Sequence, residues 1–160
     1  MCNNFGSRLD LAGTRAVVDA AVDVGITLFD TANTYGNRGG SETLLGQVLE
    51  GHRDRVVLAT KFGMDMGEGP GVARASRWYI RRAVEASLRR LQTDYIDLYQ
   101  LHMPDQITPI AETLAALDEL IHEGKVRYIG SSNLAGLASS PSPQGRGAAS
   151  WHSNGRPGDS

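Results

Sequence analysis

Four short apolar runs, each followed by a polar side chain, recur along the chain and constrain its fold more than any other feature. The polar residues that follow them are Asp30, Lys61, His102 and Ser132, at separations of 31, 41 and 30 residues. Segments with helical spacing of apolar residues separate the runs. A (β/α)8 barrel of ~250 residues has about 31 residues in each unit. We therefore predict an α/β chain of about four parallel βα units, with these polar side chains at one edge of the sheet.

The expected elements follow from apolar periodicity and from helix start and stop signals. Strands are predicted over residues 26–29, 56–60, 95–101 and 126–130, and a glycine-rich loop over 64–75. The expected helix starts and stops are Thr14 and Gly25, Ser41 and Gly51, and Thr108 and Gly124, with a further helix through Ile80, Val84, Leu88 and Leu91. Helices of this length can carry a chain back to the start of the next parallel strand.

Length and charge narrow the class of protein. The 160 residues suffice for one domain with a real core but are short for a closed eight-fold barrel. A net charge of -2 gives no reason to expect nucleic acid or an anionic membrane surface as a partner. The single cysteine, Cys2, excludes an internal disulfide, and no apolar run approaches the ~20 residues of a membrane span. We expect a cytoplasmic protein without a membrane insertion.

The composition changes near the C-terminus. Residues 139–160 contain six Ser, four Gly and three Pro and show no apolar periodicity. Such a segment cannot bury enough apolar surface to offset the entropy of ordering. We predict a folded part over residues 1–137 and a low-complexity, disordered tail over 138–160. The tail is read either as a flexible interaction segment or as the product of a shifted reading frame.

Four polar residues at the predicted strand ends could together protonate a carbonyl oxygen: Asp30, Tyr35, Lys61 and His102. A tyrosine with a pKa near ~10 is a weak acid at neutral pH. A nearby ammonium stabilises the phenolate, a carboxylate can hold that ammonium, and a histidine can hydrogen-bond to the substrate. Singly, each residue has a structural explanation as a turn cap, a loop residue or a strand-end side chain. Their common position favours catalysis.

The same segments resemble the aldo-keto reductases, in particular the bacterial branch related to channel β-subunits. The matching segments are Phe29-Asp30-Thr31-Ala32, Tyr35-Gly36, Ala59-Thr60-Lys61, Asp94 to His102 and Gly124 to Asn133. The resemblance extends from about Cys2 to Asn133. It implies a partial (β/α)8 TIM barrel that contains family strands 2–5, the N-terminal half only. It also implies NADPH as cofactor and aldehydes or ketones as substrates.

The resemblance assigns a role to each matched residue. It makes Tyr35 the general acid, Lys61 its electrostatic partner, Asp30 the residue that orients Lys61, and His102 the residue that polarises the carbonyl. The cofactor-binding residues that it implies are Ser132 and Asn133 at the nicotinamide carboxamide, Gln100 on the preceding strand, and Asn3 and Asn4 in the loop after the first family strand. The family's second half supplies most phosphate contacts, so we expect this chain to be inactive alone and to bind NADPH weakly or not at all.

Alternatives to a reductase stay open at this point. The chain could be a non-catalytic nucleotide-sensing module of the channel-subunit kind, or a non-functional frameshifted fragment. A metal-dependent barrel hydrolase has little support, because only His102 of the four histidines lies at a strand end. The carbonyl substrate and the choice between NADPH and NADH are undetermined. Open sheet edges make self-association possible.

Overall fold

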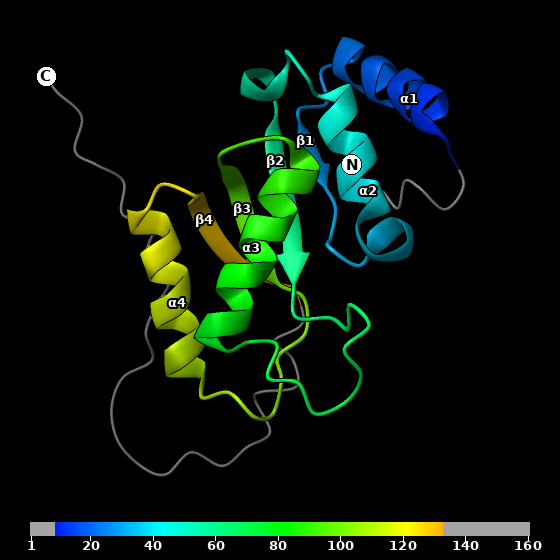
Figure 1. The fold of residues 1–160 in the computed structure, drawn as a ribbon. Helices are drawn as coiled ribbons and strands as arrows, with labels where there is room; N and C mark the ends of the chain where they lie inside the picture. The colour runs from blue at the N-terminus through cyan, green and yellow to red at the C-terminus, as the bar shows by residue number, and fades with distance from the viewer. Residues whose placement is uncertain (1–8, 133–160) are drawn as a thin grey trace, which may run out of the picture.

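The computed structural model describes residues 9–132 and shows helices and strands in alternation (Figure 1). The predicted site residues Asn3, Asn4 and Asn133 and the tail over 138–160 lie outside this range, as does the predicted domain boundary. The elements are α1 (Leu11–Asp23), β1 (Leu28–Asp30), α2 (Tyr35–Val48), the short 3-10 helix η1 (Arg53–Arg55), β2 (Val57–Phe62), α3 (Arg77–Leu91), β3 (Ile96–Leu101), α4 (Ile110–His122) and β4 (Val126–Ser131).

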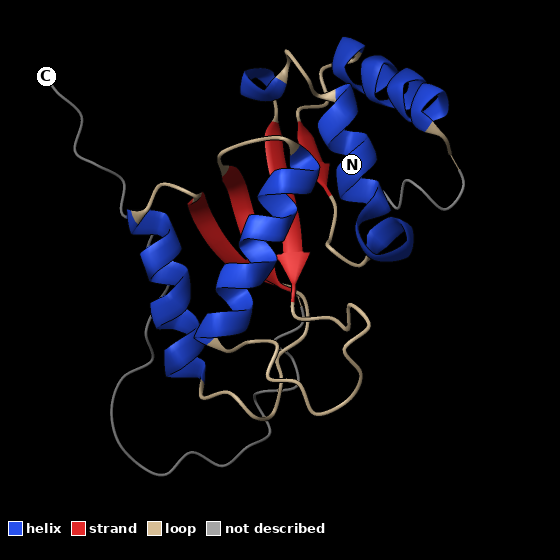
Figure 2. Cartoon of the chain, in the orientation of Figure 1, coloured by secondary structure: helices blue, strands red, loops and turns tan. Residues whose placement is uncertain are grey.

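The four strands form one parallel sheet in the order β1-β2-β3-β4. The helices α2, α3 and α4 lie on the same face of this sheet, and α1 packs beside α2 (Figure 2). This arrangement confirms the predicted fold of four parallel βα units. Because the strands are parallel, their carboxyl ends share one edge, and the residues that follow them meet there.

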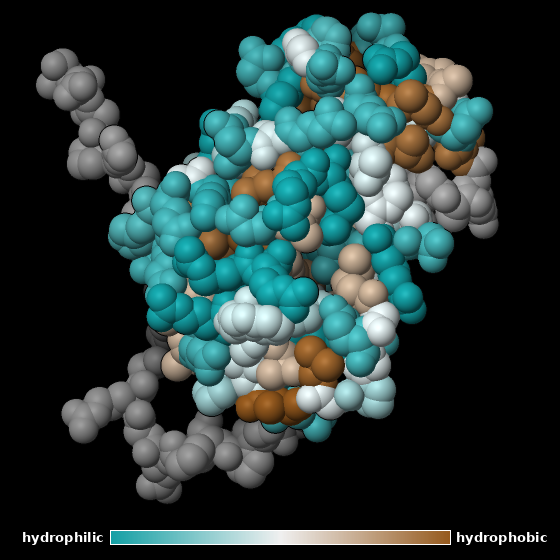
Figure 3. Space-filling view, viewed as in Figure 1, coloured by the Kyte–Doolittle hydropathy of each residue, from teal (hydrophilic) through white to brown (hydrophobic). Residues whose placement is uncertain are grey.

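The core fills the space between the helices and the sheet. Phe29, Leu58 and Phe62 point to the helices and are fully buried, and the Phe62 and Tyr99 rings stack with centroids 4.7 Å apart. The outer surface of the helices is largely hydrophilic (Figure 3). On the other face of the sheet, large apolar side chains stay exposed: Leu28 by 46%, Val57 by 44% and Tyr128 by 62%. Within residues 9–132, one sheet face is therefore packed and the other is open.

The helix starts predicted at Thr14 and Thr108 differ from those of the structure. Asp10, not Thr14, caps α1: its Oδ1 accepts from the Gly13 N–H at 2.9 Å, and the Thr14 hydroxyl donates to the Asp10 carbonyl. Thr108 does not cap α4, because its N–H and hydroxyl both bind the Asp105 carboxylate. The helix begins at Ile110 after Pro109 without a side-chain cap. In the first case the helix starts earlier, so Thr14 lies inside it; in the second, an aspartate carboxylate takes the hydrogen bonds of the threonine.

The start of α2 is interrupted by four residues with left-handed backbone. Residues 36–39 have φ between 60° and 113°, and two of them, Asn37 and Arg38, are not glycine. An Arg in this region is strained, because its Cβ crowds the backbone. Ser41, predicted as a cap, instead has a buried hydroxyl 2.9 Å from the Thr31 hydroxyl. The left-handed segment connects the loop after β1 to the regular part of α2.

Helices α2 and α3 are in close contact. Gly46 of α2 lies against the α3 backbone, where an added Cβ would come within 2.4 Å of the Arg90 carbonyl oxygen. Beside it, the fully buried Glu42 accepts from the Thr60 hydroxyl at 2.6 Å and from Arg90 Nε at 2.7 Å. A buried carboxylate needs such partners, because burial without them is costly. Glycine at position 46 allows the approach that brings them together.

Candidate active site

The centre of the site is an ion pair between the ends of β1 and β2. Lys61 Nζ lies 2.5 Å from Asp30 Oδ2 and donates to the Thr31 carbonyl at 2.9 Å. Only 6% of Lys61 is exposed, whereas Asp30 is partly accessible. A buried ammonium is tolerated when it has an anionic partner and further acceptors, and this one has both. The pair fixes the position of the lysine.

Gln100 joins the same network from β3. Its position pairs with Lys61 in the register of the sheet, and its Nε2 donates to Asp30 Oδ1 at 3.2 Å. The two oxygens of Asp30 therefore bind side chains from two different strands. The sequence placed Gln100 with the cofactor-binding residues, and the structure shows in addition that it holds the carboxylate.

Tyr35 and His102 lie beside this ion pair. The Tyr35 ring centroid is 5.4 Å from Lys61 Nζ. The Tyr35 and His102 rings meet edge to face, with centroids 5.8 Å apart and an interplanar angle of 82°. The structure thus brings together the four residues that the sequence singled out, from the ends of three strands and the loop after β1. A phenol, a cation and an imidazole in contact are suited to moving a proton.

The imidazole of His102 is held towards its neutral form. Burial lowers the pKa of His102 from its ordinary value of 6.5, and the nearby Lys61 ammonium lowers it further, while Asp30 acts in the opposite direction. The backbone N–H of His102 donates to the Phe62 carbonyl at 2.7 Å. A neutral imidazole at neutral pH can donate one hydrogen bond without being the stronger acid of the site.

Ser132 lies next to His102 at the end of β4. Its hydroxyl donates to the His102 carbonyl at 3.2 Å, and its N–H donates to the Leu101 carbonyl. Ser132 is exposed and follows β4 directly, so it lies at the same edge of the sheet as the ion pair. The remaining cofactor-binding predictions, Asn3, Asn4 and Asn133, are outside the described residues.

Asp105 is a residue at this edge that the sequence reasoning missed. Its carboxylate accepts from the Ala75 N–H at 2.6 Å and from the N–H groups of Ile107 and Thr108, so it ties the loop after β2 to the loop after β3. The sequence pattern that indicates this role is an aspartate three residues before a threonine. In such a turn, the aspartate carboxylate accepts hydrogen bonds from the backbone that follows it. In residues 9–132, no three His, Cys, Asp or Glu side chains gather closely enough to hold a metal ion.

None of the helices within residues 9–132 combines the length and the apolar character that a bilayer span requires.

Comparison with known proteins identifies one family. The family model described as "Aldo/keto reductase family" matches residues 3–139. Aldo-keto reductase YhdN from Bacillus subtilis is 49% identical over 120 residues, which is 74% of this chain and 36% of that protein. L-glyceraldehyde 3-phosphate reductase from Escherichia coli is 38% identical over 136 residues, 82% of this chain and 39% of its own. The chain thus spans about two fifths of the length of these relatives.

Solved structures give the same result. The aldo-keto reductase AKR11C1 from Bacillus halodurans, in a holo form, matches with a TM-score of 0.70 and 43% identity over 78% of this chain and 42% of its own. An aldo/keto reductase from Klebsiella pneumoniae, in complex with NADP and acetate, matches with a TM-score of 0.69 and 41% identity over 81% of this chain and 43% of its own. In each case the match covers less than half of the solved protein.

Proposed function

Because this chain belongs to the aldo/keto reductase family, we propose that it carries the proton-donating part of the active site of an NADPH-dependent reductase of aldehydes and ketones. The observation that supports this most directly is the position of the Tyr35 ring beside both the Lys61 ammonium and the His102 imidazole. The similar Klebsiella pneumoniae structures hold NADP and NADPH, which supports the same cofactor here. This arrangement places a weak acid next to a cation that would stabilise its conjugate base.

The proposed reaction moves one proton from the chain to the substrate. NADPH, when bound, supplies the hydride that adds to the carbonyl carbon. As the C=O bond opens, its electron pair moves to oxygen, and the Tyr35 hydroxyl donates a proton to that oxygen to give the alcohol. Lys61 stabilises the phenolate that remains on Tyr35, and Asp30 holds Lys61 at 2.5 Å.

His102 positions the carbonyl in this scheme. A neutral imidazole can donate a hydrogen bond to the carbonyl oxygen and polarise it. The lowered pKa of His102 keeps it neutral at pH 7, caused first by burial and then by Lys61. The proton therefore comes from Tyr35, whose phenolate has a cation beside it, and not from His102.

The described residues at the nicotinamide end fit a carboxamide. The Ser132 hydroxyl and the Gln100 amide offer both donors and acceptors at the carboxyl ends of β4 and β3. Gly130 pairs with Gln100 in the sheet. Because it has no side chain, it leaves room on this face for the planar nicotinamide ring. We propose that Ser132 and Gln100 hold the nicotinamide together with Asn133, and that Asn3 and Asn4 line the same mouth.

The proposal includes the setting of the enzyme. A small carbonyl compound is the expected partner, and the net charge of -2 offers no attraction to nucleic acid. A cytoplasmic location agrees with the single cysteine, because reducing compartments keep thiols unpaired.

A fusion protein tests the chemistry. Residues 1–133 are joined to the remaining part of YhdN, and aldehyde-dependent loss of NADPH absorbance is measured. We expect turnover, and Tyr35→Phe should lower kcat about 10²-fold or more. NADPH affinity should stay within about threefold, because the phenol acts only on the substrate oxygen in the transition state. The matched control is Tyr95→Phe at the opposite end of β3, which should keep full turnover.

Two results would contradict the proposal. If the Tyr35→Phe variant kept wild-type kcat, Tyr35 would not be the proton donor. NADPH binding by the fusion protein without turnover of any aldehyde would favour the alternative of a nucleotide-sensing module.

A further inference from the structure

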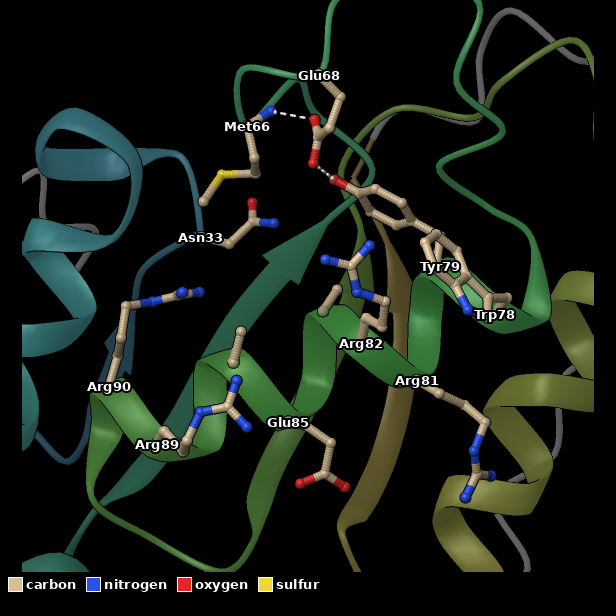
Figure 4. A pocket seen from close by; sticks show the side chains of 12 residues that line it. Asn33, Met66, Glu68, Trp78, Tyr79, Arg81, Arg82, Glu85, Arg89 and Arg90 are labelled. Carbon is tan, nitrogen blue, oxygen red and sulfur yellow. Dashed lines mark hydrogen bonds between the residues drawn. The ribbon is translucent and has the colours of Figure 1, made fainter.

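A hollow whose lining does not include the Lys61–Asp30 ion pair lies on the outer side of α3. It has a volume of about 510 Å³ and opens between the loop over residues 64–75 and the helix (Figure 4). We define the α3 groove by Asn33, Met66, Trp78, Arg82, Ala86 and Arg89, which line it. The reaction proposed above uses none of these side chains.

Two of the four arginines that line the groove have uncompensated charge. Arg81 pairs with Glu123 at 2.7 Å, and Arg90 pairs with the buried Glu42 at 2.7 Å. By contrast, neither Arg82 nor Arg89 has an ion-pair partner within residues 9–132, and Arg82 only stacks over Trp78 at 4.5 Å. The groove therefore presents two guanidinium groups that a ligand can neutralise.

The acidic side chains of the groove do not neutralise these two arginines. Glu68 accepts from the Tyr79 hydroxyl at 3.1 Å and lies 3.7 Å from Arg74 Nε. Glu85 pairs with Lys125 at 2.8 Å. Both carboxylates are directed to partners outside the pair of arginines, so the net character of the groove is cationic.

The shape favours an extended ligand. Arg82 and Arg89 are seven residues apart, which is about 10 Å along a helix axis. Ala83 and Ala86 also line the groove between the two arginines, and their small side chains take up little of its depth. In a peptide with an extended polyproline II backbone, residues i and i+3 are about 9 Å apart and lie on the same side, because this helix has three residues per turn. Two carboxylates three residues apart can thus reach both guanidinium groups.

Asn33 gives an independent indication of a ligand. Its side chain projects into the hollow (Figure 4), only 2% of the residue is exposed, and its Oδ1 has no hydrogen-bond partner within residues 9–132. A buried amide oxygen without a donor is costly, so a ligand that supplies an N–H is favoured. Peptide backbone supplies such donors, and a simple inorganic anion does not.

We propose that the α3 groove binds an extended acidic peptide segment of a partner protein, with carboxylates on Arg82 and Arg89 and a backbone N–H on Asn33. Binding does not use the proposed catalytic side chains, because Asp30, Tyr35, Lys61 and His102 are not among the residues that line the groove. Met66 and Trp78 would pack against the apolar parts of the segment.

Fluorescence anisotropy tests this with the full chain and a fluorescein-labelled peptide, Gly-Glu-Ala-Ala-Glu-Gly, at low ionic strength. We expect saturable binding that weakens with salt, and no binding of the same peptide with glutamine for glutamate. Arg82→Gln and Arg89→Gln should each weaken binding about fivefold. Arg55→Gln is the matched control: it removes the same charge from an exposed site outside the groove and should leave affinity unchanged. Thermal melting by circular dichroism checks that each variant is folded.

Three results would overturn the proposal. Equal binding of the glutamine peptide, or an equal loss with Arg55→Gln, would show that the two guanidinium groups recognise nothing specific. A lack of saturable binding would show that the α3 groove does not bind the acidic peptide. If ATP binds and is lost with Arg82→Gln and Arg89→Gln while the peptide is not bound, the groove is a nucleotide site instead.

Discussion

The Asp30 carboxylate divides its oxygens between two strands. Oδ2 binds Lys61 on β2 and Oδ1 binds Gln100 on β3. Since the lysine also donates to the Thr31 carbonyl, it has few other positions available to it. This restraint keeps the ammonium beside Tyr35. In the reaction proposed above its position matters, because a misplacement of about 1 Å can cost ~10²-fold in rate.

We predict that His102 titrates below pH 6.5 and that Lys61→Met moves its pKa upward. Burial is the larger cause of the lowered pKa and is retained in the variant, whereas the repulsion from the Lys61 charge is lost. NMR titration of the imidazole Cε1–H resonance measures both values. Arg55→Met, which removes a distant charge, is the control. An unchanged His102 midpoint in Lys61→Met would mean that the two groups do not interact.

The same shift has a consequence for stability. A histidine whose folded-state pKa is lowered binds fewer protons when folded than when unfolded. Its contribution is therefore complete above pH 6.5 and is lost as the pH falls from 6.5 through the lowered pKa. The free energy of unfolding of a His102→Gln variant should vary less with pH in that range.

At the scale of the elements, Asp105 joins the two loops that border the site. Burial alone would raise the pKa of Asp105, but hydrogen bonds from the N–H groups of Thr108, Ala75 and Ile107 outweigh it, and the pKa lies below its ordinary value of 3.8. Its stabilising effect is present above pH 3.8 and is lost as the pH falls through the lowered pKa.

We predict that Asp105→Asn loosens the loop over residues 64–75 and lowers the free energy of unfolding by about 1–3 kcal/mol. An amide has a single acceptor oxygen, so the bonds to Ala75 on one side or to Ile107 and Thr108 on the other must break. Amide hydrogen exchange of the loop checks this. Thr108→Val removes only the hydroxyl bond to the same carboxylate and should affect the loop less. Equal exchange in both variants would contradict the anchoring role.

The strands could be predicted from the sequence, but several helix starts could not. Runs such as 56–60 form an uninterrupted stretch of β-branched and other apolar residues, and this signal is local. Thr14 is not a cap because Asp10 starts the helix four residues earlier, and Thr108 is not a cap because its N–H and hydroxyl bind the Asp105 carboxylate. The left-handed backbone at Arg38 has no local signal at all, since arginine rarely adopts it. The proximity of Asp30, Tyr35, Lys61 and His102 could be predicted because each follows a predicted strand, and parallel strands end at one edge.

At the scale of the whole molecule, the two ends of the sheet differ. At the amino end, Asp97 pairs with Arg53 at 2.7 Å and with Arg127 at 2.9 Å, and both guanidinium groups stack on Tyr95. At the carboxyl end lie the ion pair of Lys61 and the rings beside it. The amino end thus carries an ion-pair network that ties η1, β3 and β4 together, and the carboxyl end carries the candidate active site.

We predict that the chain self-associates at high concentration through its open sheet face. Leu28, Val57 and Tyr128 are exposed there, and within the described residues β1 and β4 each pair with one neighbour only. Sedimentation velocity should show association that Tyr128→Lys reduces. Val24→Lys, at a more exposed apolar residue at the end of α1, is the control. A monomer at every concentration, or an equal effect of Val24→Lys, would contradict this.

The contact at Gly46 also limits how the chain can diverge. A single methyl group there would meet the α3 backbone and push apart the helices that hold Glu42 against Arg90. Exposed positions around it, such as Arg89, can accept many side chains without such a cost. In a saturation-mutagenesis library selected for folding, we expect position 46 to return glycine alone. We therefore expect evolution to accept no single amino-acid substitution at position 46, however freely the exposed residues of the two helices change.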